Sequence, residues 1–390
     1  MLKIMGERKI RVLQAIRQGK IGGGETHMLE LVSRIDKEVF TPIVLSFTPG
    51  PMVEQIEKLG IPVHIIETEQ GFNWKIWGKV RSFFKEQEID IVHAHGTRAN
   101  SNVFWAAGKL NLPLIYTIHG WSFHQDQKYL IRRLRELSEK FLTSRATSNV
   151  CVSNSNRLDG IERFGMKNST VIYNGISTEK FDPQGNYSNI RKEFNIPPDK
   201  TLIGYIVRIT VQKDPITLIN AMKIVLDQTK DVMLLVVGEG DLKEKVIQMV
   251  NDSGLSSNVL FDNFRLDVPD ILKAIDIYSL PSLWEGLPIG ILEAMSMGKV
   301  IIASPIDGTK EIITNYENGI LVPQQNPELL AKAILEVHGN KNLQMKLAKN
   351  AINTIHEKFT VNEMVKKIEN HYKSIIKCNE NRHRNSTTVP

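Results

Sequence analysis

Two glutamates stand eight residues apart in an otherwise apolar stretch, LWEGLPIGILEA, where Glu285 precedes a Gly-Leu-Pro turn and Glu293 follows it. Pro288 suits the first position of a helix, and Gly298 suits the residue after a helix end. The sequence therefore predicts a short, mostly buried helix over Pro288–Met297. Because a buried carboxylate costs free energy unless a partner satisfies it, we interpret the two glutamates as part of a ligand site.

Two kinds of chemistry fit such a pair of carboxylates. They could perform acid–base hydrolysis, as paired carboxylates do in glycosidases. They could also hold vicinal hydroxyls of a sugar or ribose, because a carboxylate accepts several hydrogen bonds. The backbone amides from Gly286 to Gly290 would add a helix start that binds an anion or a hydroxyl. The residues alone leave both alternatives open.

Two cations follow the strand-like run Leu202–Val207, namely Arg208 and Lys213. Arginine offers a planar fork and lysine a point charge, so the two together could clamp a diphosphate. The alternative is solvated surface charge.

A glycine-rich turn, Gly22-Gly23-Gly24-Glu25, follows the first strand-like run and opens a helical pattern. Glycine lets the backbone approach an anion closely, and a helix N-terminus favours negative charge. The turn matches neither the dinucleotide fingerprint GxGxxG nor a phosphate-binding Walker loop. A phosphate site and a flexible turn before a helix both remain open.

Histidines end two further strand-like runs. His93 and His95 share one face of a strand, but no carboxylate or further histidine follows closely enough to complete a metal site. We expect polar structure at a cleft wall from this pair. His119 stands beside Gly120, where it could meet a ligand hydroxyl, although the residue alone favours a structural role.

Short apolar runs alternate with amphipathic, helix-like stretches, which indicates parallel sheets covered by helices on both faces. The strand-like runs of the first half are Ile10–Ile16, Thr41–Phe47, Val63–Ile66, Ile89–His93, Leu114–Ile118, Asn149–Val152 and Thr170–Tyr173. Those of the second half are Leu202–Val207, Met233–Val237, Val259–Phe261, Ile277–Leu280, Val300–Ala303 and Gly319–Val322. The pattern predicts an α/β chain of two Rossmann-like, doubly wound domains, with the candidate residues beyond the strand ends where such sheets bind ligands.

The domain boundaries follow from a turn-rich segment, Phe181–Pro198, that separates the two halves. We expect an N-terminal domain over 1–180, a C-terminal domain over 181–364, a final helix over 365–378 and a disordered polar tail over 379–390. A length of 390 residues suits two domains.

The composition indicates the cellular compartment of the protein and the kinds of partner that it binds. The formal net charge of +6 favours anionic partners, but the basic residues form no recognised nucleic-acid motif. The two cysteines, Cys151 and Cys378, form neither a metal nor a redox motif, and no apolar run reaches the about 20 residues of a membrane span. We expect a cytoplasmic protein.

Two basic stretches, Tyr129–Arg145 and Lys75–Lys85, carry apolar residues at helical spacing. Such segments could lie on an anionic membrane surface. The interpretation that we favour from the sequence is an ordinary packed helix with a solvated basic face.

Together these motifs resemble glycosyltransferase family 4, the retaining nucleotide-sugar transferases of the GT-B fold, over about residues 9–375. The most specific part is the pair Glu285 and Glu293 with its surroundings. The chain departs from the usual pattern at Val207, where many members have glycine before the arginine, and at Asp307–Glu311, which keeps one glycine of a usual pair.

The resemblance implies roles for individual residues. Glu293 would hold the ribose of the donor, Arg208 and Lys213 its diphosphate, and Gly23 and Gly24 would close over the phosphates. Glu285 would hold the donor sugar together with the backbone of Gly286, Leu287, Pro288 and Ile289. The base would lie near Asn263–Arg265, so Arg265 joins the donor-binding set. The implied catalytic set is Glu285, His119, Arg208 and Lys213, with Glu285 positioning the sugar, and the last helix would cross back to the first domain.

The same resemblance implies an activity. It is the transfer of a sugar, with retention and without a metal or other cofactor, from a nucleotide-diphosphate sugar to a glycan or lipid-linked glycan in cell-envelope or exopolysaccharide synthesis. UDP is the favoured nucleotide, and the inner leaflet of a membrane is a further expected partner surface. The alternatives are a sugar-nucleotide epimerase or hydrolase, and a degenerate transferase that serves as a binding subunit.

Overall fold

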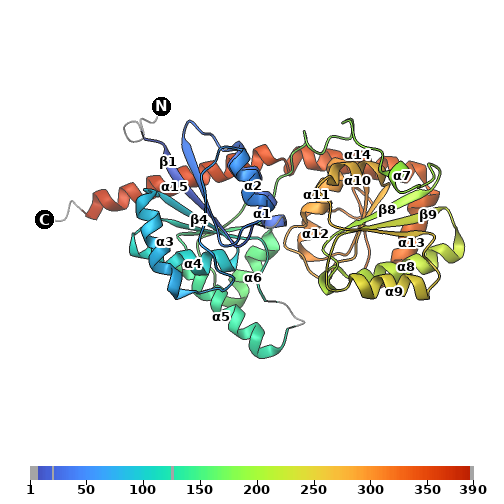
Figure 1. Cartoon of the computed structure of the whole chain (residues 1–390), viewed down its shortest axis with the longest axis horizontal. Helices are drawn as coiled ribbons and strands as arrows, with labels where there is room; N and C mark the ends of the chain where they lie inside the picture. Colours follow the sequence, from blue (N-terminus) through green and yellow to red (C-terminus); the bar gives the residue numbers. More distant parts are fainter. Residues whose placement is uncertain (1–7, 20–21, 124–126, 387–390) are drawn as a thin grey trace. The chain divides into compact units, whose positions relative to one another are not determined.

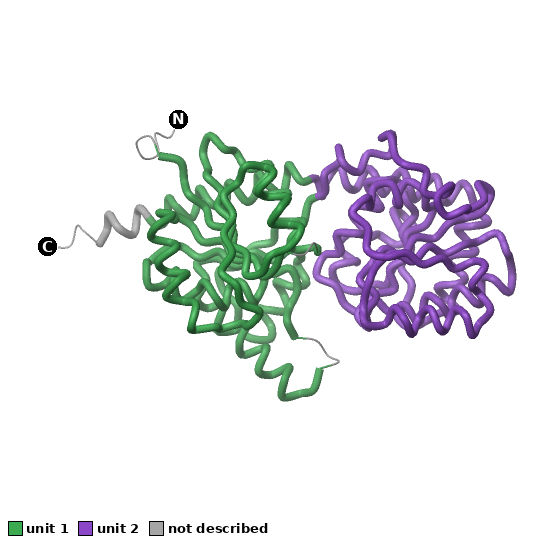
Figure 2. The backbone as a smooth tube through the Cα atoms, viewed as in Figure 1, with its two compact units in different colours: residues 1–175, 361–390 green, residues 176–360 purple. Residues whose placement is uncertain are grey.

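The computed structural model describes residues 8–19, 22–123 and 127–386, with side chains described up to residue 379. The chain forms two compact units, residues 1–175 with 361–390 (unit 1) and residues 176–360 (unit 2), which Figure 2 shows in green and purple. No helix in the described part of the chain is both long and apolar enough to cross a membrane.

The unit boundaries fall at 175 and 360, a few residues before the boundaries at 180 and 364 that the sequence suggested. The turn-rich segment after residue 180 belongs to unit 2, because its apolar side chains Phe181, Ile190 and Ile196 are buried there. The chain passes from one unit to the other at residues 175–176 and again at residues 360–361. A parallel β-bridge joins Ile176 to Thr360, the first and last residues of unit 2.

Unit 1 contains a parallel sheet with the strand order β3-β2-β1-β4-β5-β6-β7, of which Figure 1 labels the neighbouring strands β1 and β4. Its strands are β1 (Ile10–Ile16), β2 (Phe40–Ser46), β3 (Val63–Ile65), β4 (Ile91–His95), β5 (Leu114–Ile118), β6 (Ser148–Cys151) and β7 (Ser169–Val171). Its helices are α1 (Gly23–Arg34), α2 (Pro51–Lys58), α3 (Trp74–Glu86), α4 (Thr97–Lys109), α5 (Tyr129–Arg145), α6 (Asn154–Phe164) and α15 (Val361–Ser386).

Successive side chains of the strands in unit 1 enter cores on opposite faces of the sheet. On β1, Leu13 packs with α3 and α4, whereas Val12 packs with α1 and α15. The apolar residues of α15, from Val361 to Ile375, belong to this second core. The last helix is therefore part of unit 1, although the chain reaches it through unit 2.

The structure corrects three expectations at this level. The helix α15 continues to Ser386, so the predicted disorder over 379–390 is wrong for 379–386, and the remaining residues lie outside the described part. Pro288 is the residue before α11 (Ile289–Ser296) rather than its first residue. The helix α5 is present as predicted, but its apolar stripe does not pack, because Leu130, Leu134 and Leu137 are 74%, 67% and 62% exposed.

Unit 2 contains a second parallel sheet, with the strand order β10-β9-β8-β11-β12-β13. Its strands are β8 (Thr201–Ile206), β9 (Val232–Val237), β10 (Val259–Asp262), β11 (Ile277–Leu280), β12 (Val300–Ala303) and β13 (Ile320–Leu321). Its helices are α7 (Ile190–Glu193), η1 (Val211–Lys213), α8 (Pro215–Gln228), α9 (Lys243–Asp252), α10 (Val268–Ala274), α11 (Ile289–Ser296), α12 (Asp307–Ile312), α13 (Pro327–Gly339) and α14 (Lys341–Lys358).

In each sheet, successive strands are first added toward one edge and then toward the other, and the change occurs at one point, the switch point. In unit 1 this point lies between β1 and β4, and in unit 2 it lies between β8 and β11. Loops that leave the carboxyl ends of the two strands diverge there and leave room for a ligand. The candidate residues of the sequence analysis follow these four strands or their neighbours.

Candidate active site

A charged pair occupies the switch point of unit 2. Lys213, at the end of the loop after β8, forms an ion pair with Glu285, in the loop after β11. The side chain of Lys213 is 19% exposed and that of Glu285 is 9% exposed. Glu285 also accepts hydrogen bonds from Ser282 Oγ at 2.8 Å and from Gln212 Nε2 at 3.4 Å. Three donors therefore fix this carboxylate and satisfy its burial.

Backbone hydrogen bonds join the two loops that carry this pair. The amide of Leu283 donates to the carbonyl of Gln212 at 2.8 Å, and Gln212 Nε2 donates to the carbonyl of Trp284 at 2.8 Å. The hydroxyl of Tyr205, on β8, donates to the carbonyl of Lys213 at 2.9 Å. The ammonium of Lys213 is thus held on a braced turn, which lowers the entropy lost when it binds an anion.

Arg208 lies in the same loop and is exposed. It makes no hydrogen bond or ion pair with any residue that the structure describes, and so its guanidinium is available to a ligand. The loop around it is packed against the turn after β9. A Cβ at Gly238 would lie 1.9 Å from the carbonyl oxygen of Val207, and a Cβ at Gly240 would lie 2.0 Å from that of Ile209.

This Gly-Glu-Gly turn is a feature that the sequence analysis missed. Gly238 has a φ of 141°, which an L side chain rarely adopts, and the close approach leaves no room for one. The amide of Ile209 donates to the carbonyl of Glu239 at 2.9 Å, so the turn also fixes the loop that carries Arg208. Two glycines directly after the apolar run that forms β9 were the available signal.

Glu293 lies on α11, one side of which is filled by a buried tyrosine. Burial raises the pKa of Tyr278 above its usual value, and the carboxylates of Glu293 and Glu285 raise it further. The phenol therefore stays protonated, and it donates to the carbonyl of Ile206 at 3.2 Å. A Cβ at Gly290 would lie 2.4 Å from the Tyr278 hydroxyl, so glycine is needed there for this packing.

The helix α12 packs closely against the backbone that precedes α11. A Cβ at Gly308 would lie 1.7 Å from the carbonyl oxygen of Gly286, which allows only glycine at residue 308. This is the one glycine that the chain keeps in the stretch where it departs from the family pattern. The side chains of Leu287, Pro288 and Ile289 are buried, so any ligand contact that they make is through the backbone.

Arg265 is not brought to this pair. Its guanidinium binds Asp267 at 2.5 Å, Glu193 at 2.5 Å and Asp262 at 3.1 Å. These carboxylates raise the pKa of Arg265. With its donors directed at three acids, the side chain serves local structure after β10, and its expected role toward a nucleobase remains a prediction.

A chain of hydrogen bonds crosses unit 1 from α15 to the switch point of its sheet. Gln14 Nε2 donates to the hydroxyl of Tyr372 at 2.9 Å, and Gln14 Oε1 lies 2.8 Å from His95 Nε2. His95 Nδ1 lies 3.2 Å from His119 Nε2. The hydroxyl of Tyr372 also lies 2.5 Å from His93 Nδ1. His93 and His95 thus form buried polar structure, as the sequence indicated.

The direction of these bonds sets the tautomers of the histidines. Burial holds the pKa values of His95 and His119 well below their usual range, so both rings are neutral near pH 7. Since Gln14 Oε1 can only accept, His95 donates through Nε2 and accepts through Nδ1. His119 then donates through Nε2, and its Nδ1 carries a lone pair that finds no partner among the described residues.

The glycine turn lies against this histidine. The helix α1 begins at Gly23, and a Cβ at Gly24 would lie 3.2 Å from His119 Cδ2. His27, on the same helix, is buried, and its Nδ1 is 2.9 Å from Asn174 Oδ1, which leaves Nε2 as a second acceptor without a described partner. The His27 and His119 rings lie 5.0 Å apart. Unit 1 therefore contains two buried ring nitrogens, without a partner among the described residues, beside a helix N-terminus.

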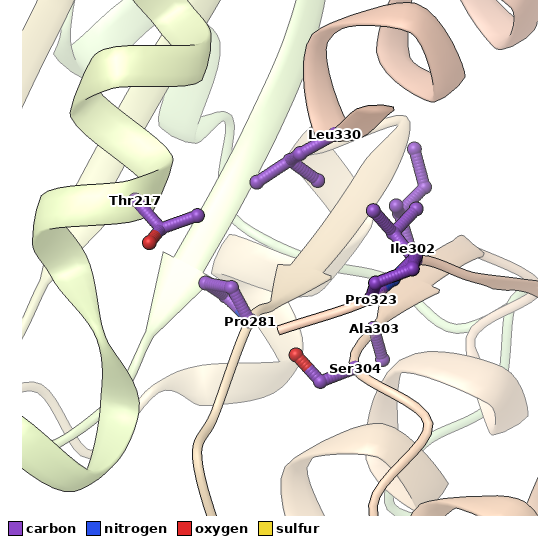
Figure 3. A pocket seen from close by; sticks show the side chains of 8 residues that line it. Thr217, Pro281, Ile302, Ala303, Ser304, Pro323 and Leu330 are labelled. Atoms are coloured by element: carbon purple, nitrogen blue, oxygen red, sulfur yellow. The ribbon is translucent and has the colours of Figure 1, made fainter. Parts of the chain in front are cut away.

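A small cavity of unit 2 lies near the strand ends but adds little to this site. A cavity of about 10 Å³ near the ends of β11, β12 and β13 is lined by Thr217, Pro281, Ser304 and Leu330, among others (Figure 3). It has room for no more than a single water molecule, so it cannot hold a nucleotide or a sugar. Within the described residues, no group of three His, Cys, Asp or Glu side chains is arranged to hold a metal ion.

Two units, each with a parallel, doubly wound sheet and with candidate residues at its switch point, form the architecture of the GT-B glycosyltransferases. Residues 21–180 match the family model described as "Glycosyltransferase Family 4", and residues 186–354 match "Glycosyl transferases group 1". Between them the two models cover most of the chain. The chain belongs to glycosyltransferase family 4, and it is a glycosyltransferase.

One relative and two solved structures illustrate what the chain is similar to. The chain is 29% identical, over 74% of its length and 76% of the relative, to a UDP-Gal:alpha-D-GlcNAc-diphosphoundecaprenol alpha-1,3-galactosyltransferase of Escherichia coli. Its fold is similar to that of HepE of Anabaena in complex with UDP and glucose, with a TM-score of 0.84 at 21% identity over 94% of this chain and 100% of the other. It is also similar to WaaG, a glycosyltransferase involved in lipopolysaccharide biosynthesis, with a TM-score of 0.74 at 17% identity over 92% and 98% of the two chains.

Proposed function

We propose that this glycosyltransferase uses a UDP-sugar as donor and transfers the sugar, with retention and without a metal ion, to a lipid-linked glycan at the inner face of a membrane. The observation that carries the proposal is the fixed Lys213–Glu285 pair at the switch point of unit 2, with the unpaired Arg208 in the same loop. The name of the Escherichia coli relative, which pairs UDP-Gal with a diphosphoundecaprenol acceptor, and the UDP in the HepE structure support the choice of substrates.

The cations suit the charge that develops during the reaction. When the bond between sugar and diphosphate breaks, negative charge grows on the leaving phosphate oxygen. Fixed donors aimed at that charge stabilise the transition state more than the ground state. Lys213 and Arg208 supply two such charges from one loop, and therefore the protein can neutralise a diphosphate without a divalent ion.

The carboxylates take different roles in this proposal. Glu285 already accepts from Lys213, Ser282 and Gln212, which makes it a weak nucleophile and a rigid acceptor for sugar hydroxyls. Glu293, on α11, accepts from the two ribose hydroxyls. His119, in unit 1, is the remaining expected catalytic residue, and its buried Nδ1 has no partner among the described residues.

A transfer assay with product analysis tests the proposal. The purified protein is incubated with UDP-glucose, UDP-galactose or UDP-N-acetylglucosamine, an undecaprenyl-diphosphate sugar and EDTA, and proton NMR gives the anomeric configuration of the product. We expect an α-linked product from an α-linked donor. A β-linked product would exclude retention, loss of activity with EDTA would exclude metal independence, and free sugar or an epimerised nucleotide sugar as the sole product would favour a hydrolase or an epimerase.

The role of Glu293 has its own test. Calorimetric titration with UDP should show weaker binding to the Glu293→Ala variant, because the variant loses the acceptor for two ribose hydroxyls. The matched control is Glu328→Ala, which removes a carboxylate from the first turn of α13 in the same unit. Equal UDP affinity in the Glu293 variant and the wild type would refute the assignment.

A further inference from the structure

The helix α5 turns an apolar stripe to the surface of unit 1. Leu130, Leu134, Leu137 and Phe141 follow one another at helical spacing and lie on one side of the helix. Leu130 is 74% exposed, Leu134 67%, Leu137 62% and Phe141 38%. Figure 1 shows α5 at the rim of unit 1, where the helix extends past the sheet.

The opposite side of α5 is polar and anchored. Glu139 is fully buried and accepts hydrogen bonds from Thr97 Oγ1 at 2.6 Å, Ser122 Oγ at 2.6 Å and Tyr116 OH at 2.9 Å. The stripe cannot rotate into the core without breaking these bonds and stranding a buried carboxyl group. The outward orientation of the leucines is therefore a fixed feature of the helix.

The charges on the outward side of α5 all have one sign. Arg133, Lys140 and Arg145 are exposed beside the stripe, and Arg133 pairs with Glu136 at 2.9 Å. Glu136 and Glu139, the acidic residues of the helix, are buried. The guanidinium of Arg145 lies 5.1 Å from the centre of the Phe141 ring. Cations thus flank an apolar stripe with no exposed carboxylate between them.

Aromatic side chains extend this surface beyond the helix. The ring of Phe72 lies 6.3 Å from that of Phe141 and is 38% exposed. Trp74, at the first position of α3, is 71% exposed, and Lys75 beside it is exposed as well. Exposed tryptophan next to lysine is typical of segments that lie in the interface of a lipid bilayer.

We propose that this surface, defined by the stripe of α5 with its flanking cations and by Phe72 and Trp74, docks the protein on an anionic lipid membrane. The leucines enter the boundary between headgroups and acyl chains, and the cations contact anionic headgroups. The positive charge argues for lipid rather than for a second copy of this chain, because a self-complementary contact would bring the same cations together. The proposal rests on the membrane location in the proposed function and names the surface that would contact the membrane. Its test needs neither donor nor acceptor, so the docking surface and the transfer activity can each be refuted separately.

Vesicle sedimentation tests the surface. The full chain is mixed with phosphatidylglycerol vesicles and, separately, with phosphatidylcholine vesicles, at low and high salt. The test variant replaces Leu134 and Leu137 by serine, and the control is Met345→Ser, which removes a side chain that is 63% exposed on α14 of unit 2. Since the three positions are exposed, both variants should fold, which thermal denaturation verifies.

We expect binding to phosphatidylglycerol vesicles that weakens with salt, and little binding to phosphatidylcholine vesicles. The double variant should bind at least about tenfold more weakly, and the Met345 control should bind like the wild type. Equal binding of the double variant and the wild type, or no binding to phosphatidylglycerol, would overturn the proposal. A dimer in sedimentation velocity that the double variant abolishes would also overturn it, because a second copy would then cover the stripe.

Discussion

Acidification from pH 7 to pH 5 should destabilise unit 1 through its buried histidines. Burial lowers the pKa of His27 to about 4 and holds those of His93, His95 and His119 well below their usual range. In the unfolded chain a histidine titrates near about 6.5. The stability that these neutral rings contribute is complete above the unfolded pKa and falls as the pH decreases toward the folded pKa, because the unfolded chain binds the proton first.

The magnitude can be worked out for His27, which is 2% exposed. Over the about 1.5 pH units between 6.5 and 5, the unfolded state carries one more proton than the native state. Each unit costs about 1.4 kcal/mol, so the loss of unfolding free energy is about 2 kcal/mol. The other three histidines add to the loss. Glu139 opposes it, because burial raises the pKa of its carboxyl group, and only a comparison with a His27 variant isolates the histidine.

Urea unfolding followed by tryptophan fluorescence measures this loss. Four of the five tryptophans report on unit 1, since Trp74, Trp77, Trp105 and Trp121 lie there and Trp284 lies in unit 2. The unfolding free energy of His27→Asn should fall by about 2 kcal/mol less than that of the wild type between pH 7 and pH 5. The exposed His356→Asn serves as the control. If the His27 variant and the wild type lose equal stability, His27 is not held neutral by burial and the reasoning is refuted.

Three further predictions concern the site. Lys213→Met should lower kcat/KM of transfer by about 10²-fold or more, because it removes a fixed charge from the leaving group, and near-normal turnover in a folded variant would contradict this role. Gly308→Ala should cost about 1–3 kcal/mol of stability and weaken UDP binding, since its Cβ would lie 1.7 Å from the loop before α11. Gly339→Ala, whose Cβ meets nothing within 4 Å, is its control, and equal melting temperatures would count against the packing argument. Tyr372→Phe should lower kcat with little change in UDP affinity and should alter the ring-nitrogen NMR shifts of His119, whereas unchanged shifts would exclude a hydrogen-bond chain from α15.

The sequence predicted the elements well where apolar periodicity decides them. The strand limits of β1 match. The short helix after Glu285 is one residue shorter at each end than predicted, because Pro288 and Met297 are its cap residues. The exposed side of α5 was misjudged for a physical reason. An apolar stripe is normally the buried side of a helix, and nothing local indicates that Glu139 takes the buried position through partners on α4, β5 and the following loop.

The site was predictable in its residue types but not in its contacts. Lys213 and Glu285 lie far apart in the chain, and their contact depends on the order of β8 and β11 in the sheet. Arg265 illustrates the opposite case, because its position after a strand suggested a ligand role, whereas Glu193, from a distant segment, helps to satisfy it within the protein. Gly238 was overlooked because close backbone packing leaves no signal other than the glycine itself.

The central claim is that the donor nucleotide binds at the switch point of unit 2, and hydrogen–deuterium exchange with and without UDP tests it most directly. We expect slower amide exchange on UDP binding in the peptides that cover 207–213 and 283–293. We expect no protection around a polar hollow of about 290 Å³ on the same unit, which Asn318 and Asn350 help to line. Protection elsewhere in unit 2, or binding of UDP that leaves both loops unprotected, would contradict it.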